Sequence, residues 1–206
     1  MIQKKIKILI LSLVGILSAC VNSNNEIIKL GPQAQTEDQA FAIEEIKKVG
    51  ERFFAGAPEK LFSKGAEGLG TAIEKIFSRF GRPNAYITGT EGSGSLVVGL
   101  RMGQGELSHK LEGTQPVYWI GPSIGFDAGG NVARTFTLIY NLYDTNELYQ
   151  RFPSAEGSAF FIGGISINYQ QNDNVIIVPI RMGLGVRLGV NTGWVKYRKK
   201  KTYSPF

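Results

Sequence analysis

The only cysteine of the chain, Cys20, has the surroundings of a lipid-attachment site. Residues 1–19 contain three lysines, then a short apolar run, and end in Leu-Ser-Ala directly before Cys20, which is the pattern of a bacterial signal peptide. A cysteine at the cleavage point is typical of a lipobox, in which the thiol forms a thioether with diacylglycerol and the new amino terminus is acylated. We therefore predict that 1–19 is a lipoprotein signal peptide and that Cys20 carries the lipid.

Two other interpretations of this start are an ordinary signal peptide with an unrelated cysteine and a single transmembrane anchor. The apolar run is too short for an anchor, because a spanning helix needs about 20 residues. Two or more acyl chains, at about 0.8 kcal/mol per buried methylene, hold a protein firmly on a membrane. Val21 follows Cys20 in place of aspartate, which in the enterobacterial sorting pattern indicates the outer membrane. The expected location is therefore the periplasmic face of a bacterial membrane, most simply the outer one.

Three arginines have the spacing to form a ligand-binding face. Arg101, Arg181 and Arg187 each lie between two apolar residues in segments that we expect to be strands. Because successive strand side chains point to opposite faces, all three point away from the apolar face. On a solvated face they would only add solubility. On a concave or barrel-interior face they could bind phosphate or carboxylate through paired hydrogen bonds, and Arg134 could belong to the same patch.

The segment Asp127-Ala128-Gly129-Gly130-Asn131 is the second candidate ligand site. Its glycines would let backbone N–H groups approach a ligand, and Asp127 and Asn131 could orient that ligand. An ordinary glycine-rich turn is the alternative. The segment lacks the Gly-x-Gly-x-x-Gly and Gly-Lys-Ser/Thr patterns of nucleotide-binding loops, so we expect no nucleotide cofactor.

A catalytic constellation is not evident. The chain has one histidine, His109, and Cys20 is assigned to the lipid, which argues against a Cys–His pair and against a multi-histidine metal site. His109 has the strand parity of apolar neighbours, as a core or cavity residue would. A Ser-His-Asp triad could be assembled on paper from Ser95 or Ser108 with Asp127, but the spacing does not support it. We predict no catalytic residue, no metal and no cofactor.

The charge of the mature chain is modest. The net charge of +6 at pH 7 falls to about +3 when the three lysines of the signal peptide are removed. This balance is too small for the basic footprint of a nucleic-acid-binding protein, and we expect no nucleic-acid partner. The basic run at 198–201 is interpreted either as a solvated tail or as a contact for anionic lipid or glycan.

The mature chain is long enough for one domain with its own core. Residues 20–37 lack a sustained apolar period and are predicted to be a tether. In 38–82, apolar residues recur twice at helical spacing, which predicts two amphipathic helices separated near Gly56 and Pro58. Residues 83–206 follow as a strand-rich region, and we expect 38–206 to be one folding unit.

Short apolar runs between glycine- and asparagine-rich turns predict roughly eight antiparallel strands in 83–206. We expect them at 96–102, 106–112, 117–126, 135–143, 157–170, 175–182, 184–190 and 194–198. Gly103-Gln104-Gly105 is expected to be the turn of the first hairpin. Internal glycines mark bulges and corners. The predicted fold is mainly β with N-terminal helices: a small, glycine-rich antiparallel β-barrel or strongly curled sheet, with the helical segment packed on one face or mouth.

Several short motifs follow one another along this chain in a characteristic order. They are Gly-Leu at 68–69, Ile-Glu-Lys at 73–75, Gly-Arg-Pro-Asn-Ala-Tyr-Ile at 81–87, Gly-Ser-Leu-Val-Val-Gly-Leu-Arg at 94–101, Gly-Gly-Asn at 129–131, Thr-Phe at 135–136, Leu-Tyr-Gln-Arg-Phe-Pro at 148–153, Glu-Gly-Ser-Ala at 156–159 and Pro-Ile-Arg at 179–181. In this order they resemble the EipA family of bacterial envelope proteins, long catalogued as a domain of unknown function. The resemblance covers 38–206 and implies a small periplasmic β-barrel with helical N-terminal elements and a role in envelope integrity. It supplies no catalytic residues. The strand order is also distantly similar to the SYLF lipid-binding domain, which implies a lipid ligand.

Three functions of different classes follow from these observations. We predict a non-enzymatic, periplasm-facing lipoprotein that supports envelope integrity by binding a lipid, a glycan or an envelope protein. An integral outer-membrane barrel is indicated by the terminal Phe206, although Pro205 interrupts a final strand and long alternating segments are not evident. A hydrolase of envelope glycans would need two positioned carboxylates, and Asp127, Glu106 and Glu156 have no spacing that pairs them.

Overall fold

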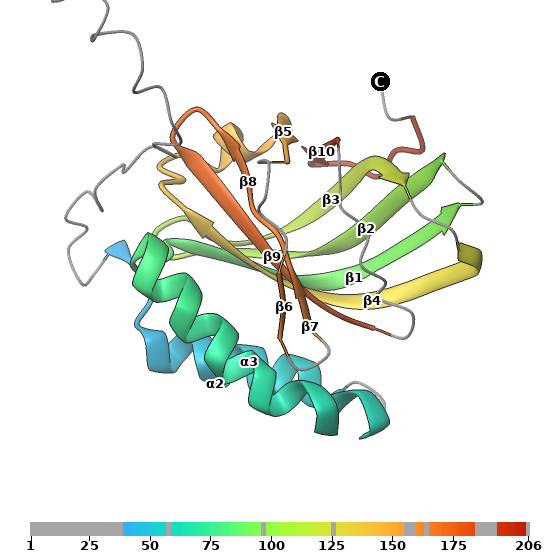
Figure 1. Cartoon of the computed structure of the whole chain (residues 1–206). Helices are drawn as coiled ribbons and strands as arrows, with labels where there is room; N and C mark the ends of the chain where they lie inside the picture. Colours follow the sequence, from blue (N-terminus) through green and yellow to red (C-terminus); the bar gives the residue numbers. More distant parts are fainter. Residues whose placement is uncertain are drawn as a thin grey trace, which may run out of the picture. The chain divides into compact units, whose positions relative to one another are not determined.

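In the computed structural model, the described residues are 39–56, 59–95, 98–124, 127–154, 160–162, 165–183 and 193–204, and they belong to one compact unit (Figure 1). The predicted signal peptide, Cys20 and the predicted tether lie outside this part of the chain, as do Arg187 and the last two residues.

Two helices precede the strands, at the positions that the apolar spacing predicts. They are α2 (Ile43–Ala55) and α3 (Glu59–Phe80). The buried stripe of α2 includes Ile46 and Phe54, and acidic residues in its first turn complement the helix dipole. Gly81 follows α3 with a φ of 78° and donates its N–H to the Phe77 carbonyl at 2.8 Å, a left-handed helix end that favours glycine.

The strands of the described residues form one antiparallel sheet. They are β1 (Ala85–Ser95), β2 (Val98–His109), β3 (Gly113–Ile124), β4 (Asp127–Tyr140), β5 (Arg151–Pro153), β6 (Phe160–Ile162), β7 (Ile165–Ile167), β8 (Gln170–Asn172), β9 (Val175–Gly183) and β10 (Trp194–Arg198). A short 3-10 helix, η2 (Thr145–Leu148), precedes β5, and the Asp144 side chain accepts the N–H of Asn146 at its start. The strand order is β5-β10-β3-β2-β1-β4-β9-β7-β6, and β8 pairs with β9.

The sheet curls until its two halves meet. Ser154, next to β5, forms an isolated bridge with Gln170 of β8. The Asn172 amide strengthens this contact by donating to the Gln150 side chain at 2.9 Å and to the Arg151 carbonyl at 3.0 Å. The fold prediction is therefore confirmed: the protein is mainly β, with two helices and a strongly curled, barrel-like antiparallel sheet (Figure 1). We call the space that the curled sheet surrounds the lumen.

The sheet has one core on each of its two faces. The inner core fills one end of the lumen and includes Ile87, Leu107, Phe152 and Val195. The outer core lies between the helices and the outer face of β4, β7 and β9 (Figure 1). Its large buried members include Phe54, Leu69, Ile73, Phe136, Leu138, Tyr140, Ile167 and Ile180. Because β9 faces the lumen on one side and helices on the other, its residues up to Met182 are all buried, which explains its continuous apolar sequence.

The predicted hairpin turn at Gly103-Gln104-Gly105 is wrong, because β2 runs straight through these residues. Their glycines serve a different purpose. A Cβ atom at Gly103 or Gly89 would collide with the indole of Trp119, which lies over both positions on the lumen side. Neighbouring strands therefore need glycine here to make room for one large side chain, and close packing produces the same composition as a turn.

Candidate functional site

A buried ion cluster lies in the lumen where β1, β2 and β9 each contribute one charged side chain. Arg181 Nε lies 3.0 Å from Oε1 of Glu91, and Arg101 Nε lies 3.9 Å from the same oxygen. The three residues are only 3–6% exposed. Arg101 and Arg181 therefore lie on an interior face and not on a solvated one. A carboxylate of the chain itself lies between their two guanidinium groups.

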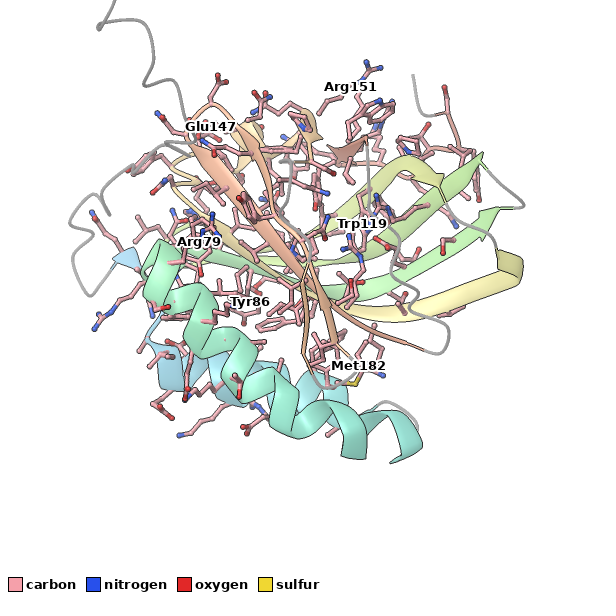
Figure 2. The ribbon with its side chains drawn as sticks, in the orientation of Figure 1. Arg79, Tyr86, Trp119, Glu147, Arg151 and Met182 are labelled. Carbon is pink, nitrogen blue, oxygen red and sulfur yellow. The ribbon has the colours of Figure 1, made fainter. Side chains whose placement is uncertain are left out.

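Two further side chains complete the hydrogen bonding of this cluster. The Trp119 indole donates to Oε2 of Glu91 at 2.8 Å, and Arg181 also donates to the Asn168 side-chain oxygen. Both oxygens of Glu91 are thus occupied. Arg101 is less well paired, since it makes one long contact of 3.5 Å to the Pro122 carbonyl and its Nε has no hydrogen-bond partner. Figure 2 shows Trp119 next to β1 and β2, within the curl of the sheet.

The electrostatics of the cluster favour a charged carboxylate. Burial raises the pKa of Glu91, but the charges of Arg181 and Arg101 and the hydrogen bonds from Trp119 and Arg181 outweigh it, so that its pKa lies below the usual range. Burial lowers the pKa of Arg101, and Glu91 opposes this effect. Burial also raises the pKa of the nearby Tyr197, which stays neutral. The cluster therefore holds two cations and one anion at neutral pH.

Arg134, in contrast to the sequence-based expectation, does not share this face. It lies on the outer face of β4, where it donates to the Gly56 carbonyl at 2.8 Å and lies 4.5 Å from the centre of the Phe53 ring. Its partner across the sheet is Met182, whose neighbour Arg181 points into the lumen. A shift of one residue reverses the face in a strand, and for this reason Arg134 caps the end of α2.

The predicted loop around Asp127 and Asn131 is strand instead. The backbone of β4 includes both residues, with Asn131 opposite Ser93 and Asp127 opposite Ser95, and an irregularity near Gly94. Their side chains, like the whole of Arg187, lie outside the described part of the structure. A ligand role for these three residues stays a prediction.

His109 is held at the other end of the lumen by backbone groups. Its Nδ1 accepts the N–H of Glu112 at 3.0 Å, which leaves Nε2 as the protonated nitrogen that donates to the Leu142 carbonyl at 2.7 Å. Both ring nitrogens are therefore engaged in fixing the chain around the β2–β3 turn. Among the described residues, no three His, Cys, Asp or Glu side chains are arranged to hold a metal ion.

A Gly-x-Ser-x-Gly sequence at 121–125 has the spacing of a hydrolase nucleophile elbow. An elbow places its serine on a sharp turn between a strand and a helix. Here Ser123 belongs to β3, and the next element is the strand β4. Ser123 therefore lacks the strand–turn–helix setting that makes the serine of an elbow a nucleophile.

The opposite, outer face of β1, β2 and β3 carries a groove of about 580 Å³. Its apolar lining consists of Leu100, Met102, Tyr118, Trp119, Ile120, Val132 and Tyr203, and Glu91 also lines it. Leu100 and Met102 are each 39% exposed, and Val132 and Tyr203 are about 70% exposed. Large apolar side chains gathered in an open groove mark an interaction site.

The C-terminal basic residues border this groove. Arg198 and Lys201 line it, and Lys201 lies 5.5 Å from the ring centre of Tyr203. Lys199 is held away from it by a 2.6 Å hydrogen bond to the Asn146 side chain. The run at 198–201 is thus partly strand β10 and partly groove border, and not simply a solvated tail.

Sequence reasoning missed this groove because it assigned the apolar parity of β2 to the core. At this end of the sheet the polarity is reversed: Leu100 and Met102 face outward, and Arg101 between them faces the lumen. Two sequence features could have indicated the groove: the apolar pair Leu100 and Met102 on β2, and the basic run at 198–201 that is followed by Tyr203.

Comparison with known proteins agrees with this architecture. The family model of Envelope integrity protein A (EipA) matches residues 44–206. The chain belongs to the EipA family. Its fold is also that of a crystal structure described as a beta-barrel-like, uncharacterized protein from Brucella abortus, with 42% identity, a TM-score of 0.69, and coverage of 82% of this chain and 99% of that chain. No match is found among curated proteins.

Membership in the EipA family confirms the resemblance and associates the protein with the cell envelope. Family membership does not name a ligand. The described helices of this EipA-family protein are too short or too polar to cross a membrane. The candidate ligand-binding residues of the described chain are those of the lumen cluster and the outer groove.

Proposed function

We propose that this EipA-family protein is a non-catalytic lipoprotein that supports the envelope by binding an anionic lipid in the outer groove. It would be anchored through Cys20 at the periplasmic face of the outer membrane. The observation that carries the proposal is the groove itself, in which exposed Leu100 and Met102 lie beside the cationic Arg198 and Lys201.

The groove has the size and lining that a lipid requires. Its volume of about 580 Å³ lies within the usual range of ligand sites, about 300–1,000 Å³. An acyl chain would bury its methylenes against the exposed Leu100, Met102 and Val132, at about 0.8 kcal/mol for each methylene. Lys201 and Arg198 at the border would attract the negative head group. A neutral glycan would not use these apolar side chains.

The alternatives have less support. An integral barrel exposes its outer face to lipid acyl chains, whereas α2 and α3 cover the outer face of β4 and β9 here. A hydrolase needs an available base, and both nitrogens of His109 are bound to backbone groups. Glu91, the buried carboxylate, lies between two arginines as a stable anion and is no proton donor at neutral pH.

Photocrosslinking in membranes tests the proposal. The full-length lipoprotein is reconstituted into phosphatidylcholine vesicles that contain photoactivatable phosphatidylglycerol, and the crosslinked peptides are mapped. We expect crosslinks on β2 and on residues 198–204. The Leu100→Asp/Met102→Asp double variant should lose roughly tenfold of the β2 signal, because it places charge in the apolar lining.

Leu111→Asp is the matched control, since Leu111 is 65% exposed but lies in the β2–β3 turn outside the groove. Its crosslinking should equal that of the natural chain. Crosslinks confined to the N-terminal tether, or equal β2 crosslinking in the double variant, would overturn the proposal. If β2 captured an envelope protein or a glycan in whole cells, and no lipid, the lipid proposal would be wrong and that protein or glycan would be the ligand.

A further inference from the structure

We propose that Arg101, in the ion cluster of the lumen, binds a small carboxylate or phosphate anion. Arg101 faces the lumen side of β2, whereas Leu100 and Met102 of the lipid groove face outward, and Glu91 and Trp119 of the cluster also line the groove. The inference comes from the charge count of the lumen and from the chemistry of the polar atoms that are left without partners there.

The described part of the lumen carries an excess of positive charge. On the described strands, the ionised side chains that point inward are Glu91, Arg101 and Arg181, which sum to one net positive charge. A buried charge without a counter-ion is costly, since the interior cannot replace the solvation that water supplies. Arg181 satisfies this requirement with Glu91 and Asn168. Arg101 is the cation that remains undercompensated.

The buried polar atoms without partners around the cluster are hydrogen-bond donors. They are Nε of Arg101, Nδ2 of Asn168 and the hydroxyl of Thr135, which can also accept. Arg101 is 3% exposed, Asn168 is 2% exposed and Thr135 is 1% exposed. Buried donors without partners, next to a cation that shares its described counter-ion with Arg181, favour an acceptor that carries negative charge. A water molecule would satisfy the donors but would leave the charge.

The residues that carry these donors are all linked to Glu91 or Arg181. Arg101 and Arg181 contact the same oxygen of Glu91. Asn168 is bound to Arg181 through its side-chain oxygen, which leaves its amide nitrogen to donate elsewhere. Thr135 is the direct partner of Arg181 across the β4–β9 ladder. A guanidinium is planar and matches the two oxygens of a carboxylate or phosphate.

Thermal unfolding of the full chain in detergent tests the site. Sodium acetate or sodium phosphate replaces sodium chloride at constant ionic strength and pH, so that only the anion changes. Above the dissociation constant of the bound anion, the unfolding midpoint should rise by roughly 3–5 °C for each tenfold increase in its concentration. The relative effect of acetate and phosphate identifies which of the two groups the site prefers.

Arg101→Lys keeps the charge and removes the planar pair of donors, and it should weaken the anion response about tenfold. Arg52→Lys is the matched control, because Arg52 is exposed on α2 and donates to the Lys48 carbonyl within the described part of the chain, and its response should equal that of the natural chain. A midpoint that is insensitive to both anions, or an undiminished response in Arg101→Lys, would overturn the proposal. Either result would leave the lipid groove untouched, because its crosslinking test uses other residues.

Discussion

Arg181 and Glu91 are joined by a 3.0 Å ion pair although a whole strand separates them in the sheet. Arg181 lies on β9 and Glu91 on β1, and β4 runs between the two. The pair can form only because the sheet is curled tightly enough to bring its alternate strands together on the concave side.

Removal of the shared carboxylate should destabilise the protein strongly. Glu91→Gln leaves two buried guanidinium groups without their anion, and we expect a loss of about 3–5 kcal/mol in unfolding free energy, measured by urea titration at neutral pH. Glu45→Gln is the control, because the Glu45–Lys110 pair at 3.4 Å is half exposed and should contribute under about 1 kcal/mol. Equal losses in both variants would show that the cluster has no special role in stability.

The contribution of Glu91 should also depend on pH. Its pKa in the folded protein is lowered, so the carboxylate contributes stability above its unfolded pKa of about 4.3, and this contribution is lost as the pH falls through the folded pKa. The difference in unfolding free energy between the natural chain and Glu91→Gln should be constant near pH 6–7 and shrink below about pH 4.3. A difference that grows on acidification would contradict the lowered pKa.

The glycine under Trp119 should not tolerate a methyl group. Gly103→Ala places a Cβ atom inside the indole ring, and we expect a loss of about 1–3 kcal/mol from overpacking. Gly70→Ala on α3 is a matched control, since a Cβ there meets nothing within 4 Å and alanine favours the helix by up to about 1 kcal/mol. Thermal unfolding of the two variants should therefore shift in opposite directions. A stable Gly103→Ala variant with unchanged Trp119 fluorescence would contradict the packing.

The predicted lipid attachment at Cys20 can be tested in cells. Cys20→Ser should move the protein from the membrane pellet to the soluble periplasmic fraction, because the predicted acyl chains are its attachment. Carbonate extraction of the Cys20→Ser variant separates the two membrane alternatives. An integral barrel would remain in the pellet without its lipid, and that result would refute the anchored interpretation.

Much of the fold was predictable because hydrophobic periodicity is local. The four- and three-residue spacing in 38–82 predicts the two helices that are observed, and β9 and β10 lie within a residue of their expected bounds. The glycine-rich segments were harder. Gly103 was assigned to a turn and Gly129 to a loop, since a glycine needed for a turn and one needed for close packing are the same letter.

The candidate site was predictable only in part. Strand parity placed Arg101 and Arg181 on one face, but it could not distinguish an interior from a solvated face. Parity also gave no means of finding Glu91, because the sequence distance between Glu91 and Arg181 carries no information about contact. Arg134 was grouped with them because it follows the 127–131 segment, and the register of β4 against β9 places it on the other face.

The sequence by itself determined the class of the fold and the family, because these depend on local patterns and on motif order, and it predicts the lipid attachment at Cys20. The tertiary structure alone decided what the arginines do. The curl of the sheet brings Arg101 and Arg181 onto one carboxylate and turns Leu100 and Met102 outward into a groove. Which face of a strand is concave depends on how the whole sheet closes, and no local stretch of residues encodes that closure.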